Sequence, residues 1–159
     1  MKKTTPKPYN DRTDPEKIQS QWVKLTGLHD RTDWSAAVVR AATATEITAN
    51  LAIRAEYAAL GTLDAAAVNK KLIDANGLNG KMKLLLPLLK NTDKYAVVKG
   101  LSKLATSIND KRNGIVHRGE FCSAVQATEL IGHCEQFVHG VVHLYDPTFI
   151  LKMLARDEE

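Results

Sequence analysis

The fold is decided by residues 33–61, which read DWSAAVVRAATATEITANLAIRAEYAALG. An aspartate suited to capping a helix begins this stretch, and a glycine suited to ending a helix closes it. Because the stretch is rich in alanine, neighbouring helices can pack closely against it. We therefore predict a long central helix from Trp34 to Leu60. The residues that this helix places roughly on one side are Val38, Ala42, Thr45, Ala49, Ala52 and Leu60.

The segments around this stretch also have helical patterns, and none alternates polar and apolar residues as a strand does. Asp14-Pro15-Glu16 predicts the start of an earlier helix that Gly27 ends. Later helices are predicted at residues 65–75, at 78–89 with a disturbance at Pro87, from 93 into the motif described below, at 122–145, and from about 148 to 155. The sequence thus predicts an all-α, up-and-down bundle with short additional helices. It forms one helical domain over residues 14–159, preceded by a flexible tail at 1–13 that is rich in Lys, Thr and Pro.

Composition and chain length limit the kind of protein. Of the 159 residues, 44% are hydrophobic and 25% are charged, which is typical of a globular protein with a core. The longest apolar run, Leu84 to Leu89, is too short to cross a bilayer, and no apolar segment follows the first residues as in a signal peptide. Cys122 and Cys134 lie about 18 Å apart along one predicted helix and cannot pair. We expect a cytoplasmic protein with reduced thiols and no membrane partner.

Charge is distributed unevenly along the chain. The formal net charge is +4, but residues 70–118 contain eleven Lys and Arg against three Asp, which makes this segment +8 and the rest of the chain −4. Such a basic segment suits a polyanionic partner, although a solvated lysine-rich helix face would also produce it.

The basic segment contains the motif Arg112-Asn113-Gly114-Ile115-Val116-His117. Neutral histidine can accept a proton from a hydroxyl near neutral pH, guanidinium binds phosphate oxygens, and a carboxamide can orient either group. These groups meet the needs of RNA cleavage by the neighbouring 2'-hydroxyl, which requires no metal. Five residues correspond to about 140° around a helix, so a regular helix would not direct Arg112 and His117 to one point. We therefore expect an irregular turn at Gly114, between the end of one helix and a break at Gly119.

The motif resembles the R-x4-6-H signature of the HEPN superfamily, all-helical domains found in prokaryotic toxins and phage-defence ribonucleases. The resemblance is sharpest over RNGIVHRG, residues 112–119, and extends to Glu46 in AATATEITANLAIR. It implies a homodimeric, metal-independent hydrolase that cleaves RNA without a cofactor, as a toxin with a cognate antitoxin protein or as a phage-defence effector. Its catalytic residues would be Arg112, Asn113, His117 and Glu46, and the flanking cations Lys111 and Arg118 would bind substrate. Toxins paired with nucleotidyltransferase antitoxins usually carry tyrosine two residues after the histidine, where this chain has Gly119.

Other readings of the sequence stay open. Glu46 and Arg54 share a helix face and form an internal ion pair or reach the site. Glu135, His139 and His143 recur at spacings of four, as in a metal site, but they equally suit a polar stripe between helices or subunits, and we predict no metal site. The chain also resembles, more faintly, the mannitol operon repressor family, which implies a non-catalytic helical regulator or dimerisation module.

Overall fold

The computed structural model describes residues 5–152, and within that range it contains only helices and connections, with no strand. The elements are the 3-10 helix η1 (Tyr9–Asp11) and the α-helices α1 (Asp14–Asp30), α2 (Trp34–Leu60), α3 (Ala65–Asp74), α4 (Gly77–Leu89), α5 (Tyr95–Arg118) and α6 (Ala124–Val142). The predicted all-α bundle is confirmed. None of the helices in the described range combines the length and apolar character needed to cross a membrane.

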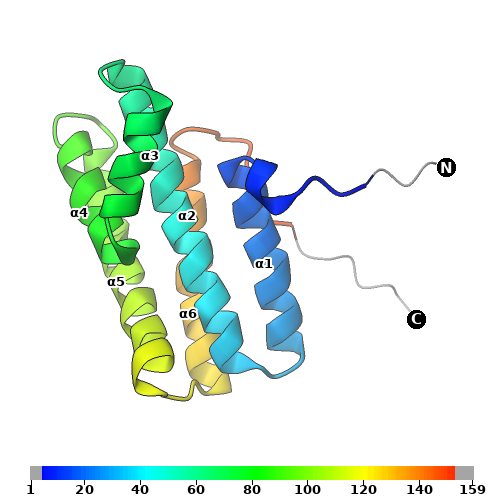
Figure 1. Cartoon of the computed structure of the whole chain (residues 1–159). Helices are drawn as coiled ribbons and strands as arrows, with labels where there is room; N and C mark the ends of the chain where they lie inside the picture. Colours follow the sequence, from blue (N-terminus) through cyan, green and yellow to red (C-terminus); the bar gives the residue numbers. More distant parts are fainter. Residues whose placement is uncertain (1–4, 153–159) are drawn as a thin grey trace.

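Helix α2 lies at the centre of the bundle and contacts α1, α4, α5 and α6 (Figure 1). Its predicted bounds are confirmed, because the Asp33 carboxylate accepts a hydrogen bond from the amide of Ala36 at 3.3 Å and Gly61 adopts a left-handed conformation with φ 66°. Among the residues predicted to share one side of this helix, Leu60 is 57% exposed. Leu60 occupies the last turn of α2, where the chain reverses and no helix covers it.

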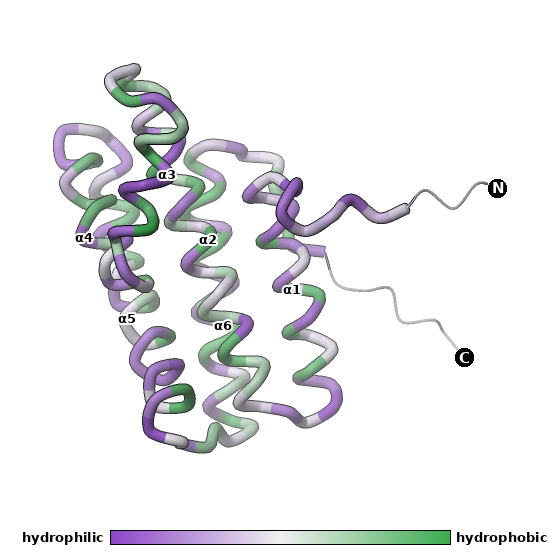
Figure 2. Tube along the Cα trace, viewed as in Figure 1, coloured by the Kyte–Doolittle hydropathy of each residue, from purple (hydrophilic) through white to green (hydrophobic). Residues whose placement is uncertain are grey.

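Two hydrophobic clusters hold the helices together, and α2 contributes to both. Trp22 of α1 and Val38 of α2 belong to the first cluster, whereas Ile53 of α2 and Leu85 of α4 belong to the second. Hydropathy changes repeatedly along the long helices, as expected when each turns one apolar face to the core (Figure 2). This packing fixes α5 against α2 and α4, and the site described below lies where these three helices meet.

Several predicted boundaries differ from the structure because tertiary packing overrides local signals. Helix α1 continues through Gly27 to Asp30, since burial of Leu25 offsets the cost of about 1 kcal/mol for glycine in a helix. Helix α6 begins at Ala124, so Cys122 lies in the preceding connection. Residues 146–152 form a turn and irregular backbone instead of the start of a final helix, and residues 153–155 lie outside the described range.

Within the predicted N-terminal tail, side chains of residues 5–13 contact α1. Lys7 pairs with Glu16 at 3.1 Å, and the guanidinium of Arg12 donates to the hydroxyl of Ser20 at 3.0 Å. Thr13 rather than Asp14 caps the helix. These interactions place the cations of this segment along the surface of α1.

Candidate functional site

Helix α5 carries the motif without interruption, so the predicted break at Gly114 was wrong. Its C-terminus is Arg118, where Gly119 adopts φ 65° and the amide of Glu120 donates to the carbonyl of Gly114 at 3.1 Å. Gly114 has a packing role: a Cβ atom built there would lie 2.1 Å from Oε2 of Glu120. The missing side chain gives the Glu120 carboxylate room to lie over α5, where it accepts from Nε of Arg118 at 2.9 Å.

Three side chains of the motif converge even though their helix is regular. Nη1 of Arg112 lies 3.0 Å from Oδ1 of Asn113 and 3.2 Å from Nε2 of His117. The expectation that a regular helix would keep Arg112 and His117 apart was wrong, because the long arginine side chain spans the angular separation. Since a guanidinium group only donates hydrogen bonds, Nε2 of His117 accepts in this contact when the imidazole is the neutral tautomer with its proton on Nδ1.

This cluster lines a polar groove of about 600 Å³ between α2, the start of α4 and the last turns of α5. His117 is exposed, Arg112 and Asn113 are half-buried, and Asn109 is only 7% exposed at the base of the same helix face. The groove residues outside the predicted set include Thr43, Asn76, Asn79 and Asn109. The carboxamides and hydroxyl offer hydrogen bonds to a polar ligand, and the guanidinium offers a fixed positive charge.

Glu46 lies in the groove, but its ion pair is with Lys81, at 3.7 Å. Lys81 is a buried residue of α4 whose Nζ also donates to the carbonyl of Leu72 and, at 2.8 Å, to that of Ala75. The cation therefore ties the end of α3 to α2 and holds the Glu46 carboxylate beside the groove. Arg54 does not pair with Glu46; its guanidinium forms two hydrogen bonds to the Asp14 carboxylate, at 2.7 and 2.8 Å.

The two cations predicted to bind substrate have different positions. Arg118 lines the groove, with its Nε held by Glu120. Lys111 faces the connection after α5, where its Nζ donates to the carbonyl of Phe121 at 2.9 Å and lies 3.5 Å from Oε2 of Glu120. Lys111 is not among the groove residues.

Asn109 was missed by sequence reasoning, although its spacing contained the signal. It precedes Asn113 by four residues and His117 by eight, and residues four apart share a helix face. Thr43, Asn76 and Asn79 had no such signal, because their proximity depends on how α2 and α4 pack against α5.

The remaining candidate groups have structural partners. Nε2 of His139 accepts from the amide of Leu151 at 3.2 Å, and Nε2 of His143 donates to the carbonyl of Phe149 at 2.6 Å. Residues 5–152 contain no cluster of three or more His, Cys, Asp or Glu side chains arranged to bind a metal ion. Burial raises the pKa of the Cys134 thiol to about 12, which makes it a poor nucleophile.

The fold and groove define an all-α bundle with one Arg-Asn-His cluster at a polar groove within the described residues. No protein-family model matches this chain, and no curated protein and no solved structure is significantly similar to it.

Proposed function

We propose that this protein is a metal-independent endoribonuclease of the HEPN type, acting as a toxin or phage-defence effector. The observation that carries the proposal is the convergence of Arg112, Asn113 and His117 at a polar groove, with Nη1 of Arg112 3.2 Å from Nε2 of His117. A non-catalytic regulator has no need for an exposed imidazole held beside a guanidinium group.

The chemistry assigns one role to each group. The 2'-oxygen attacks the adjacent phosphorus, forming the P–O2' bond while the P–O5' bond breaks. His117 accepts the 2'-hydroxyl proton, and a second acid returns a proton to the departing O5'. Arg112 stabilises the negative charge on the phosphorane, and Asn113 orients the guanidinium through the 3.0 Å hydrogen bond. The products are a 2',3'-cyclic phosphate and a 5'-hydroxyl.

A second copy of the chain supplies the second acid. The groove contains one histidine, whereas the reaction uses a base and an acid. Exposed hydrophobic side chains lie at the end of the bundle where α5 ends and α6 begins: Val116, Phe121 and Val125 are 47%, 89% and 78% exposed. A two-fold interface at this end would bring two His117 side chains toward one shared groove. The proposed function therefore includes a homodimer.

Substitution of His117 and Arg112 tests the proposal. Each of His117→Ala and Arg112→Ala should lower the rate of single-stranded RNA cleavage by about 10² to 10⁴, because each removes a group that acts in the transition state. Wild-type cleavage should persist in EDTA. Since His117 is exposed and Arg112 half-buried, the thermal midpoint should change by only a few degrees. Full cleavage by both folded variants, or an absence of cleavage by the wild type, would favour the helical regulator instead.

A further inference from the structure

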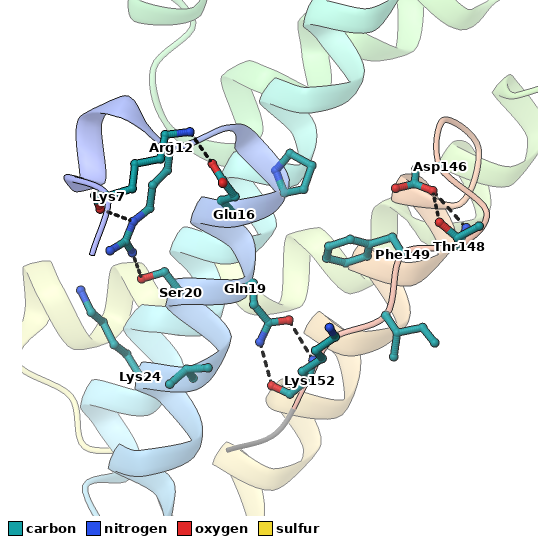
Figure 3. Close-up of a pocket in the computed structure, with 13 residues that line it drawn as sticks. Lys7, Arg12, Glu16, Gln19, Ser20, Lys24, Asp146, Thr148, Phe149 and Lys152 are labelled. Atoms are coloured by element: carbon teal, nitrogen blue, oxygen red, sulfur yellow. Dashed lines mark hydrogen bonds and ion pairs between the residues drawn. The ribbon is translucent and has the colours of Figure 1, made fainter. Parts of the chain in front are cut away.

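A second groove, on the outer face of α1, gathers cations away from the Arg112–His117 site. It has a volume of about 680 Å³ and lies between α1, the segment before it and residues 146–152 (Figure 3). Its charged residues are the cations Lys7, Arg12, Lys24 and Lys152 and the carboxylates Glu16 and Asp146. These cations lie outside residues 70–118, in the part of the chain whose net charge is −4, so the charge distribution along the sequence did not predict them.

Both carboxylates of the groove already have partners. Glu16 pairs with Lys7 at 3.1 Å, and Oδ1 of Asp146 accepts hydrogen bonds from the amide and the hydroxyl of Thr148 at 3.1 and 2.7 Å (Figure 3). Neither carboxylate forms an ion pair with the other cations in the groove. The positive charge on this surface is thus not neutralised by the groove itself.

The ring of Tyr9 holds three cations close together on this side of α1. The charged groups of Arg12, Lys17 and Lys24 lie 5.7, 5.7 and 5.6 Å from the ring centroid. Within residues 5–152, none of the three forms an ion pair with a carboxylate. The ring attracts each cation by about 0.5–1 kcal/mol, while the cations repel one another, so the arrangement suits a ligand with several negative charges.

A third hollow lies beside the α1 groove, on the side toward α2. This hollow of about 320 Å³ lies between α1 and α2 and shares Lys24 with the α1 groove. On its α2 side it is lined by Arg40, whose guanidinium donates to Oε1 of Gln21. The preceding residue, Val39, lines the Arg112–His117 groove. The third hollow thus extends the α1 groove as far as α2, the helix that also forms one wall of the Arg112–His117 groove.

We propose that Arg12, Lys17, Lys24 and Arg40 form a basic track for the backbone of single-stranded RNA whose scissile phosphate lies at Arg112 and His117. This inference rests on the proposed ribonuclease function and extends it to the substrate. Cations spaced along a surface bind successive phosphates without reading sequence. A single strand fits better than a duplex, because the α1 groove also contains the apolar surfaces of Phe149 and Val23, against which unpaired bases can pack.

Binding of labelled single-stranded RNA to the full chain tests the basic track. The variant is Lys17→Ala with Lys24→Ala, in a His117→Ala background that prevents cleavage. The matched control is Lys99→Ala with Lys103→Ala, which removes the same charge from exposed positions on α5 that neither contact the Tyr9 ring nor line any of the three hollows. Removing the two track cations should weaken binding by about tenfold. The slope of the logarithm of the binding constant against the logarithm of the salt concentration should also become shallower by about 0.7 for each phosphate that the protein no longer neutralises.

Cleavage of two substrates separates this inference from the proposed function. With His117 intact, the track variant should cleave a dinucleotide at the wild-type rate but show a raised KM for a long single strand. Equal binding by the track and control variants would overturn the track while leaving the ribonuclease in place. Duplex DNA that binds as tightly and depends equally on Lys17 and Lys24 would overturn the assignment to single-stranded RNA. RNA binding that requires these lysines in a protein that cleaves no RNA would support the track and reject the proposed function.

Discussion

Lys81 shows how one buried cation holds the groove in place. Its Nζ has three partners, the carbonyls of Leu72 and Ala75 and the carboxylate of Glu46, and the side chain is 7% exposed. Methionine at this position would fill the space but leave two carbonyls and a carboxylate without the charge that stabilises them. The sequence contained no sign of this role, because a lysine in a basic segment normally lies in solvent.

We expect Lys81→Met to destabilise the protein by about 1.5–3 kcal/mol. At roughly 2–4 °C per kcal/mol for a domain of this size, the thermal midpoint should fall by several degrees. Thermal unfolding followed by circular dichroism measures the change. Lys83→Met, in the exposed neighbouring turn of α4, is the control and should shift the stability by no more than about 0.5 kcal/mol. Equal shifts in both variants would show that the interactions of the Lys81 ammonium contribute nothing.

His139 makes stability depend on pH. Burial, together with the neighbouring His143, lowers the pKa of His139, whose Nε2 accepts from the amide of Leu151. Below about pH 6.5 the unfolded chain therefore binds a proton at this residue that the folded chain does not bind. Since stability falls wherever the unfolded state binds more protons, the protein should lose stability as the pH drops through this range.

The substitution His139→Gln should reduce that loss, because an amide oxygen accepts the same hydrogen bond without titrating. Urea unfolding of both proteins near neutral pH and about one and a half units lower measures the difference. The free energy of unfolding should fall more in the wild type than in the variant. A loss of the same size in both proteins would show that other groups account for the pH dependence.

At the scale of elements, α5 contains two glycines that serve different purposes. Gly119 ends the helix in a left-handed conformation and has open space around it, whereas Gly114 is helical and its missing Cβ accommodates Glu120. The same substitution should therefore have different consequences at the two positions.

Gly119→Ala should destabilise the protein by about 1–2 kcal/mol, because alanine is strained at φ 65°. Gly114→Ala should leave stability unchanged or slightly raised, because about 0.5–1 kcal/mol of helix preference offsets the displacement of a flexible carboxylate. Thermal unfolding compares the two variants. A large destabilisation by Gly114→Ala would show that the position of Glu120 over α5 contributes substantially to stability.

At the scale of the whole molecule, the proposed homodimer places the exposed apolar end of the bundle at its two-fold interface. Phe121 and Val125 are among the most exposed hydrophobic residues of the described chain. We expect the wild type to be a dimer at micromolar concentration, and Phe121→Glu with Val125→Glu to be a folded monomer that has lost cleavage. Light scattering and RNA cleavage measure the two properties together.

Ile73→Glu is the matched control, because Ile73 is 80% exposed on α3 rather than at the α5–α6 end and lines none of the three hollows. It should remain dimeric and active. A monomeric wild type that cleaves RNA would contradict the need for two copies of His117.

Local sequence determined where a helix begins and ends wherever its capping residues and its tertiary packing favour the same bounds. Asp33 and Gly61 set both ends of α2, since a capping carboxylate and a left-handed glycine act within one turn of chain. The sequence predicted that Arg112, Asn113 and His117 come together through an irregular turn at Gly114, whereas their side chains converge on a regular helix. Gly27 and Gly114 were misread, since a glycine in a helix costs only about 1 kcal/mol and long-range packing outweighs it.

Only the tertiary structure decided which distant residues join the motif. Lys81 reaches Glu46, and Lys24 and Arg40 face one hollow, because α1, α2 and α4 pack together around apolar side chains. That packing depends on the rotation and offset of whole helices, which spacing within one helix does not specify. The sequence therefore determined the helical fold class and the placement of the motif on one helix, while the packing of helices determined the groove around that motif.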